Sequence, residues 1–193
     1  MKKAFVLAAL AGLGTTAAAQ PASYVDLGAI TGDTVINGFF DAGEVAWVRF
    51  EIPAISAPLY LDFATEGSTN PDGSTADTEL GLYDGVGNFV ATDDDDGVSL
   101  FSVLTFGAGS GLMLGDSFNL GGDGIANGED GNLGAGVYWL AIGEYNTTYN
   151  AANWDVAGGN EAVNYVLSVY ANIPAPASLA LLGLGGLVAR RRR

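Results

Sequence analysis

The sequence contains no cysteine and no histidine. Without these residues it offers no disulfide, no thiolate or imidazole ligand for zinc, and neither a Ser-His nor a Cys-His nucleophile pair. Stability must therefore come from a hydrophobic core, and a bound metal ion is the remaining way to cross-link the chain.

Basic residues are almost absent between the two ends of the chain. Lys2 and Lys3 open the sequence and four arginines, 190–193, close it, so Arg49 is the one base in between. That segment holds all 22 acids and has a net charge of −21, against −15 for the whole chain. Such a surface repels nucleic acid and anionic membranes. The partners that it favours are cations, and Ca²⁺ is the first candidate outside the cell.

These absences also narrow the enzyme classes. The segment between the ends has no lysine, which excludes a Schiff base and a lysine general base. Only a carboxylate pair of the glycosidase kind remains, and among 22 acids some pair will be suitably spaced by chance. We predict that the protein is not an enzyme. A carboxylate-dependent hydrolase would require a cleft with two acids of clearly separated pKa.

Length and composition indicate one folded domain. The chain has 193 residues, of which 49% are hydrophobic, so it can bury a core and is not an acidic disordered protein. It has 29 glycines but only 6 prolines, without a collagen-like period. This balance is typical of short strands joined by many tight turns.

The N-terminus has the layout of a signal peptide. A basic start, 1–3, precedes an apolar stretch over 4–13 and small residues at Ala17, Ala18 and Ala19. We predict a signal helix over 1–19 that signal peptidase removes after Ala19, so that the protein is exported.

The C-terminus has the layout of a removable membrane anchor. An apolar run over 177–189 spans 13 residues, fewer than the ~20 that cross a bilayer untilted. The four arginines that follow would stay on the cytoplasmic side. We predict a short hydrophobic transmembrane helix that holds the protein transiently.

The segment 173–193 resembles the PEP-CTERM sorting signal, in which a proline motif precedes a short Leu/Gly-rich helix and a basic tail. The motif residues here are Pro174, Pro176, Ala177 and Ser178, with Ala175 where the family usually has Glu. The resemblance implies sorting and cleavage by an exosortase-like enzyme in a Gram-negative bacterium that makes exopolysaccharide. The protein would be anchored transiently in the inner membrane and end at the cell surface or outside the cell.

Between the ends, alternating apolar residues predict strands and no long helix. In 45–52, for example, Val48, Phe50 and Ile52 share one face while Trp47 and Arg49 lie on the other. We predict a single antiparallel β-sandwich or jelly-roll-like domain over 20–172. The predicted strands are 45–52, 59–63, 80–83, 89–92, 100–106, 137–145 and 164–171. A long loop rich in Gly and Asp, 107–136, is predicted to be a functional surface loop or one ordered by an ion.

The domain resembles the bacterial pre-peptidase C-terminal (PPC) domain. The motifs are Asp77 to Asp84, Gly87-Asn88, Val90 to Gly97, Gly134 to Gly143 and Asn164 to Val169, in the expected order. The resemblance implies a small β-sandwich that usually accompanies an enzyme or belongs to a surface protein. The motif residues mostly determine the fold, so the resemblance concerns fold more than activity.

The acidic run 93–96 is the sharpest local feature. If 80–83 and 89–92 form a hairpin with its turn at 84–88, the run leaves the hairpin where Asp77 enters it. Adjacent carboxylates repel, and a hard cation relieves this repulsion. We predict Ca²⁺ as a cofactor; a solvated acidic turn is the alternative. The predicted ligands are Asp77, Asp93, Asp94, Asp95 and Asp96.

Two tryptophans could stack on a sugar. Trp47 lies on the polar face of its strand and Trp154 in a loop-like segment. An exposed, coplanar aromatic pair would distinguish a carbohydrate-binding module from a domain whose aromatic residues are buried.

Together these features predict an exported, non-catalytic cell-surface or matrix protein that associates with exopolysaccharide and binds Ca²⁺. A specific carbohydrate-binding module is the alternative, and a carboxylate-dependent hydrolase is the second alternative.

Overall fold

The computed structural model describes residues 19–54, 60–107 and 131–173. The predicted signal helix, apart from Ala19, lies outside these residues, and so does most of the loop 107–136. The sorting residues Pro174, Pro176, Ala177 and Ser178 and the predicted C-terminal helix also lie outside them.

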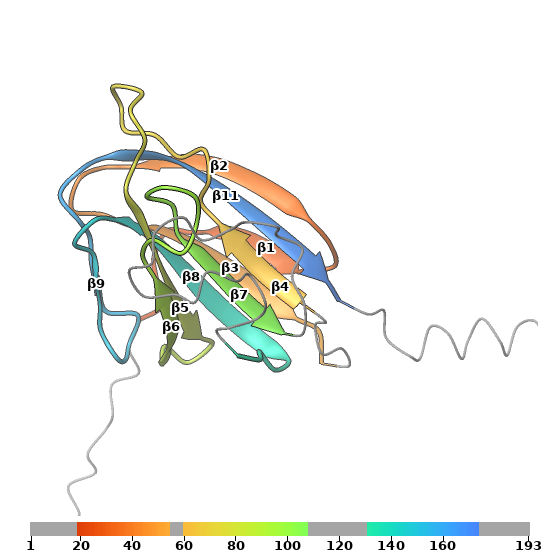
Figure 1. The fold of residues 1–193 in the computed structure, drawn as a ribbon. Coiled ribbons are helices and arrows are strands. Elements are labelled where there is room, and N and C mark those ends of the chain that lie inside the picture. The colour runs from red at the N-terminus through yellow and green to blue at the C-terminus, as the bar shows by residue number, and fades with distance from the viewer. Residues whose placement is uncertain (1–18, 55–59, 108–130, 174–193) are drawn as a thin grey trace, which may run out of the picture.

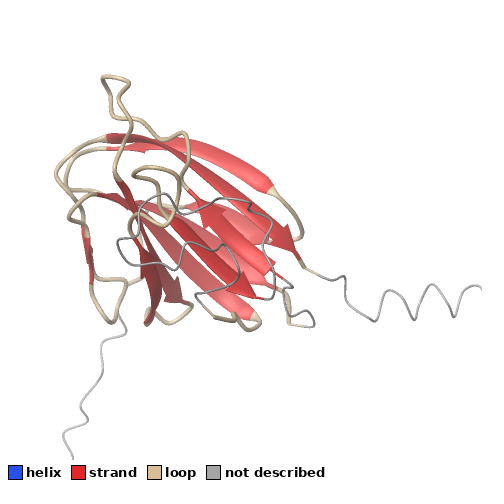
Figure 2. Ribbon diagram, in the orientation of Figure 1, coloured by secondary structure: helices blue, strands red, loops and turns tan. Residues whose placement is uncertain are grey.

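The described residues form an all-β fold of two main sheets, as predicted (Figures 1 and 2). The five-stranded sheet contains, in spatial order, β1 (Val25–Ala29), β3 (Ala46–Ile52), β8 (Gly136–Glu144), β5 (Thr78–Asp84) and β6 (Phe89–Asp93). The four-stranded sheet contains β2 (Thr34–Phe40), β11 (Val163–Asn172), β4 (Tyr60–Ala64) and β7 (Val103–Gly107). The strands β9 (Thr148–Tyr149) and β10 (Val156–Ala157) pair with each other in a small two-stranded sheet. Within the described residues no helix is long and apolar enough to cross a membrane.

The core lies between the two main sheets and follows the predicted alternation. Val48, Phe50 and Ile52 of β3 are buried, and Phe50 meets Phe63 of the opposite sheet with ring centroids 5.2 Å apart. Every second residue of these strands points inward because successive side chains alternate across a sheet. All seven predicted strands occur, with shifts of at most three residues at either end.

Strands β1 and β2 were not predicted, and β1 adds one parallel pair to the predicted antiparallel sandwich. It pairs with β3 in parallel, whereas the other strand pairs are antiparallel. The chain leaves β1, crosses to β2 in the other sheet and returns in β3, so β1 and β3 run in the same direction. The pair is irregular between Asp26 and Ala29, and Gly28 has φ of 61°, which interrupts a regular strand pattern.

Candidate functional site

The β5–β6 hairpin assembles the acidic residues. Leu80 lies opposite Asp93, and the connecting turn occupies 84–88, as predicted. The run that starts at Asp93 therefore leaves the hairpin beside the start of β5, where Asp77 lies. Residues 16 or more positions apart in the sequence are thus brought to one end of the sheet.

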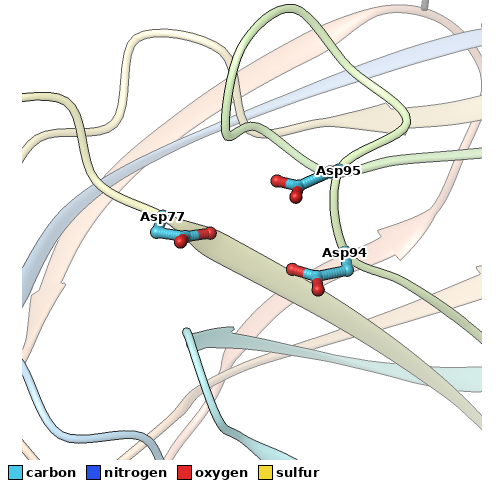
Figure 3. Close-up of side chains that lie close together, drawn as sticks. All are labelled: Asp77, Asp94 and Asp95. Carbon is cyan, nitrogen blue, oxygen red and sulfur yellow. The ribbon is translucent and has the colours of Figure 1, made fainter. Parts of the chain in front are cut away.

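Three of the five predicted ligands converge there. One carboxylate oxygen each from Asp77, Asp94 and Asp95 lies within 4.8 Å of the others. The three side chains point toward one another, Asp77 from the residue before β5 and the other two from the turn after β6 (Figure 3). Because Ca²⁺ binds oxygen at 2.3–2.6 Å, two ligands on opposite sides of one ion are roughly 5 Å apart. The spacing of the three oxygens is therefore compatible with a single cation.

Among the described residues, nothing compensates the negative charge of the cluster. Asp95 is only 9% exposed, and its Oδ1 atom and that of Asp77 are buried without a hydrogen-bond partner. Arg49, the one base among the described residues, pairs with Asp26 on the β1–β3 pair at 2.9 Å. A buried carboxylate oxygen without a donor is costly, and a cation is the partner that satisfies several at once.

The pKa values of the clustered acids are raised, as expected for carboxylates that are buried close to one another. Burial first, and then the charges of Asp95 and Asp94, raise the pKa of Asp77 to about 6. Burial and the neighbouring acids, Asp94 foremost among them, raise the pKa of Glu79 to about 7. The pKa values of Asp94 and Asp95 are also raised, by burial and by adjacent carboxylates. A positive ion would reverse the shifts that arise from these neighbours.

Asp93 and Asp96 are not part of the converging group. Asp93 Oδ2 accepts hydrogen bonds from the backbone N–H of Val103 at 2.6 Å and of Asp96 at 3.4 Å. Burial, followed by a side-chain hydrogen bond with Asp96, raises the pKa of Asp93 to about 9. Through these contacts Asp93 ties the acidic turn to the start of β7.

Buried hydroxyl groups hold the turn in place, and sequence reasoning missed them. The hydroxyls of Thr65 and Thr78 lie 2.6 Å apart. Ser102 Oγ lies within hydrogen-bond distance of the backbone carbonyls of Thr78 and of Asp94, the latter at 2.6 Å, and its single proton can be donated to either. Ser102 thus joins the two segments that carry the converging carboxylates. No local motif marks it, because its role depends on where β7 lies relative to β5.

Glu79 and Glu144 form a second acidic layer and were also missed as site residues. Glu79 Oε1 accepts from the N–H of Asn146 at 2.8 Å. Glu144 Oε2 accepts from the N–H groups of Asn160 and Glu161 at 2.7 and 3.0 Å. Both residues are buried. The charge of Glu144 contributes to the raised pKa of Asp77, and the charges of Asp94 and Asp77 contribute to that of Glu79.

The two candidate sugar-binding tryptophans do not form an exposed pair. Trp154 is buried and meets Trp139 at 6.1 Å with the rings inclined by 71°. Trp47 contacts Tyr83 instead, at 5.7 Å. Both belong to a second small core that the loop around β9 and β10 makes on the outer face of the five-stranded sheet. The condition set for a stacking platform at Trp47 and Trp154 is therefore not met.

Comparison with solved structures finds a likeness in fold. No protein-family model matches the chain, and no curated protein matches it. Among solved structures, the chain is similar to the crystal structure of the pre-peptidase C-terminal domain of a collagenase from Bacillus anthracis. The match covers 80% of this chain and 99% of that chain, with 12% sequence identity and a TM-score of 0.40.

Proposed function

We propose that this protein is an exported, non-catalytic surface or matrix domain that binds Ca²⁺ through Asp77, Asp94 and Asp95. The observation that supports this most is that the three carboxylates converge. One buried oxygen of Asp77 and one of Asp95 also have no hydrogen-bond donor among the described residues. Three ionised carboxylates without a base beside them are a ready-made environment for a divalent cation.

The chemistry of the ligands favours calcium among the common metals. All donors are hard carboxylate oxygens, and the chain has no Cys or His to favour zinc or copper. The ligands come from the residue before β5 and from an irregular turn, an arrangement that suits the flexible geometry of Ca²⁺ better than the strict octahedron of Mg²⁺. Because Ca²⁺ takes 6–8 oxygens, three carboxylates leave positions for water and for an outside ligand.

Those open positions support a role in the extracellular matrix. Asp94 is exposed, so an ion held by the cluster would remain reachable from solvent. A Ca²⁺ ion could then bridge the acidic protein to acidic groups of an exopolysaccharide that the protein alone would repel. The ion would also join the start of β5 to the turn after β6 and so stabilise the hairpin.

A carboxylate hydrolase receives no comparable support. The pKa values of Asp77 and Glu79 are raised to about 6 and about 7, so both shift in the same direction. A glycosidase-like pair requires two acids whose environments push their pKa values apart.

Calcium-dependent thermal unfolding of the full chain tests the proposal. From a chelator-treated baseline, added Ca²⁺ should raise the melting temperature progressively, because binding to the native state stabilises it by about 2.7 kcal/mol at 100 times Kd. Mg²⁺ at equal concentration should raise it less. Asp95→Asn should abolish the calcium-specific rise, whereas Glu51→Gln, which removes one exposed acid on β3, should preserve it.

Two results would contradict the proposal. Equal shifts with Ca²⁺ and Mg²⁺ in the unmodified chain would indicate general screening of negative charge. An undiminished calcium response in Asp95→Asn would place any bound ion elsewhere in the chain.

We also propose that the tail sorts the protein, on the sequence pattern of Pro174, Pro176, Ala177 and Ser178. With an exosortase-like enzyme present, the full chain should be exported and lose both ends, which intact mass spectrometry would detect. Pro174→Ala with Pro176→Ala should leave the C-terminal end attached and the protein in the membrane fraction. Release of this variant at the normal rate would exclude sorting through the motif.

A further inference from the structure

The four edge strands of the two sheets differ in how they are protected. β1 carries the Asp26–Arg49 ion pair and an irregularity at Gly28. β6 has an interrupted register with β5 and leads into the acidic run. All five residues of β7 are buried. Bulges, charges and burial are the usual means of preventing an edge from pairing with another chain.

Within the part of the chain that the structure describes, β2 has none of these protections along its own length. Its seven residues, TVINGFF, contain no charge and no proline, and they pair with β11 in one unbroken register. Val35 and Phe39 on its outer face are 59% and 53% exposed. A regular, uncharged edge strand offers its free backbone N–H and C=O groups to another strand.

We propose that β2 pairs with β2 of a second copy of this chain, antiparallel, with Asn37 opposite its own counterpart. In this register Val35 of each copy lies opposite Phe39 of the other, which gives two apolar–aromatic cross-strand pairs. The two four-stranded sheets would then form one sheet of eight strands across a two-fold axis.

Two features favour a second copy over another strand. The exposed apolar residues lie symmetrically, two positions before and two after Asn37, so the strand complements itself when reversed. The chain carries a net charge of −15, and two copies repel wherever acidic surfaces meet. β2 is a surface without charge and therefore a place where this repulsion is weakest.

The expected contact is weak and depends on salt. A single seven-residue strand from each copy buries less than the ~1,200 Å² of a standard stable interface. Asp33 and Asp41 flank the strand, and the proposed register places Asp33 of one copy opposite Asp41 of the other at both ends. Added salt screens these pairs and should increase the dimer fraction.

Single-cysteine cross-linking of the full chain tests the register, because the chain has no cysteine of its own. Asn37→Cys should give a disulfide-linked dimer under mild oxidation, since residues directly opposite have Cα atoms ~4.5–5.5 Å apart, within disulfide range. Val35→Cys alone should link slowly, because the two copies of position 35 would be roughly 14 Å apart. Combining Val35→Cys with Phe39→Cys should restore rapid linking.

Asn164→Cys, an exposed position on the neighbouring strand β11, is the matched control. Asn37→Cys should link at least tenfold faster than this control, and faster still in high salt. Equal rates for the two variants would overturn the proposal, and so would rapid linking by Val35→Cys alone, which belongs to another register.

A second variant tests the contact without cysteine. Val35→Lys should abolish concentration-dependent dimerisation in sedimentation experiments, whereas Val86→Lys, in the exposed β5–β6 turn, should preserve it. Dimerisation that survives Val35→Lys at full strength would also overturn the proposal.

Discussion

Both ends of the β5–β6 hairpin carry carboxylates, but the pKa values are shifted in opposite directions at the two ends. At the turn, Asp84 Oδ1 accepts from the N–H groups of Val86 and Asn88 at 2.9 and 2.8 Å, and Oδ2 accepts from Asn88 Nδ2 at 2.8 Å. Burial opposes ionisation of Asp84, but these hydrogen bonds prevail and lower its pKa. At the open end, burial and neighbouring acids raise the pKa values of Asp77, Asp94 and Asp95.

The difference teaches that the number of available hydrogen-bond donors, and not the number of acids, separates the structural Asp84 from the aspartates that we propose as metal ligands. Asp84 has three donors for its two oxygens, whereas the described residues supply none to the buried Oδ1 atoms of Asp77 and Asp95. A carboxylate that is already satisfied gains little from a cation, and one that lacks partners gains much.

The largest expected effect comes from removing the satisfied carboxylate. Asp84→Ala deletes three hydrogen bonds, and at about 1 kcal/mol each it should destabilise the protein by about 2–3 kcal/mol. The melting temperature should fall by about 5–10 °C. Thermal unfolding followed by circular dichroism would measure the loss. The rise in melting temperature on adding Ca²⁺ should persist in this variant. Its disappearance would mean that the two ends of the hairpin are not independent.

The two ends should also respond to pH with opposite sign. In chelator, the raised pKa values of Asp77, Glu79 and Asp93, about 6, about 7 and about 9, mean that the native state holds protons that the unfolded state has released. Stability should therefore fall as the pH rises from about 4 through 9. Asp84, with its lowered pKa, contributes stability that is lost as the pH falls below its unfolded value.

Urea unfolding at fixed temperature across pH 4–9 would measure this slope. Glu79→Gln should flatten the slope near neutral pH, and Ca²⁺ should flatten it further by stabilising the ionised cluster. Stability that rises steadily over the same range without metal would show that the acids at the open end are not strained.

A smaller effect is expected from removing one unsatisfied carboxylate. In chelator at pH 8, Asp95→Asn should stabilise the protein by about 1 kcal/mol, because it removes a buried charge that lacks a partner. Glu51→Gln, at an exposed position, should change stability by less than about 0.5 kcal/mol. Destabilisation by Asp95→Asn in the absence of metal would indicate that the native fold already satisfies this carboxylate.

The smallest effect is expected at Asp93. Burial raises the pKa of Asp93 and so favours its neutral form, for which an amide of similar shape is a close replacement. Asp93→Asn should change the free energy of unfolding at pH 7 by about 0.5 kcal/mol or less. It should also remove the part of the pH slope that lies near pH 9. A loss of several kcal/mol at pH 7 would show that Asp93 is ionised there.

Much of the hairpin could be predicted from the sequence because its signals are local. Alternating apolar residues defined β5 and β6, and Asp84 to Asn88 has the composition of a turn. The proximity of Asp77 to the acidic run followed from this pairing alone. The edge strands β1 and β2 were missed because Gly28 and Gly38 interrupt their patterns, and Gly38 is required where the ring of Tyr165 lies against the backbone.

The different structural roles of the four consecutive aspartates could not be predicted from the sequence. The sequence has four consecutive aspartates, Asp93 to Asp96, and the alternation of apolar residues gives no reason to assign them different roles. Asp93 is distinguished by the N–H of Val103, which reaches its side chain only because β7 begins beside the end of β6. The burial of Trp154 likewise depends on the loop that folds over Trp139.

By itself the sequence determined the class of fold, the acidic character of the protein and the position of the acidic run at the open end of a hairpin. These depend on residue type and on short-range periodicity. Only the tertiary structure decided which carboxylates converge, which are satisfied by backbone donors and which edge strand remains unprotected. Each of these depends on contacts between segments distant in the chain, where a few ångströms determine whether an oxygen has a partner.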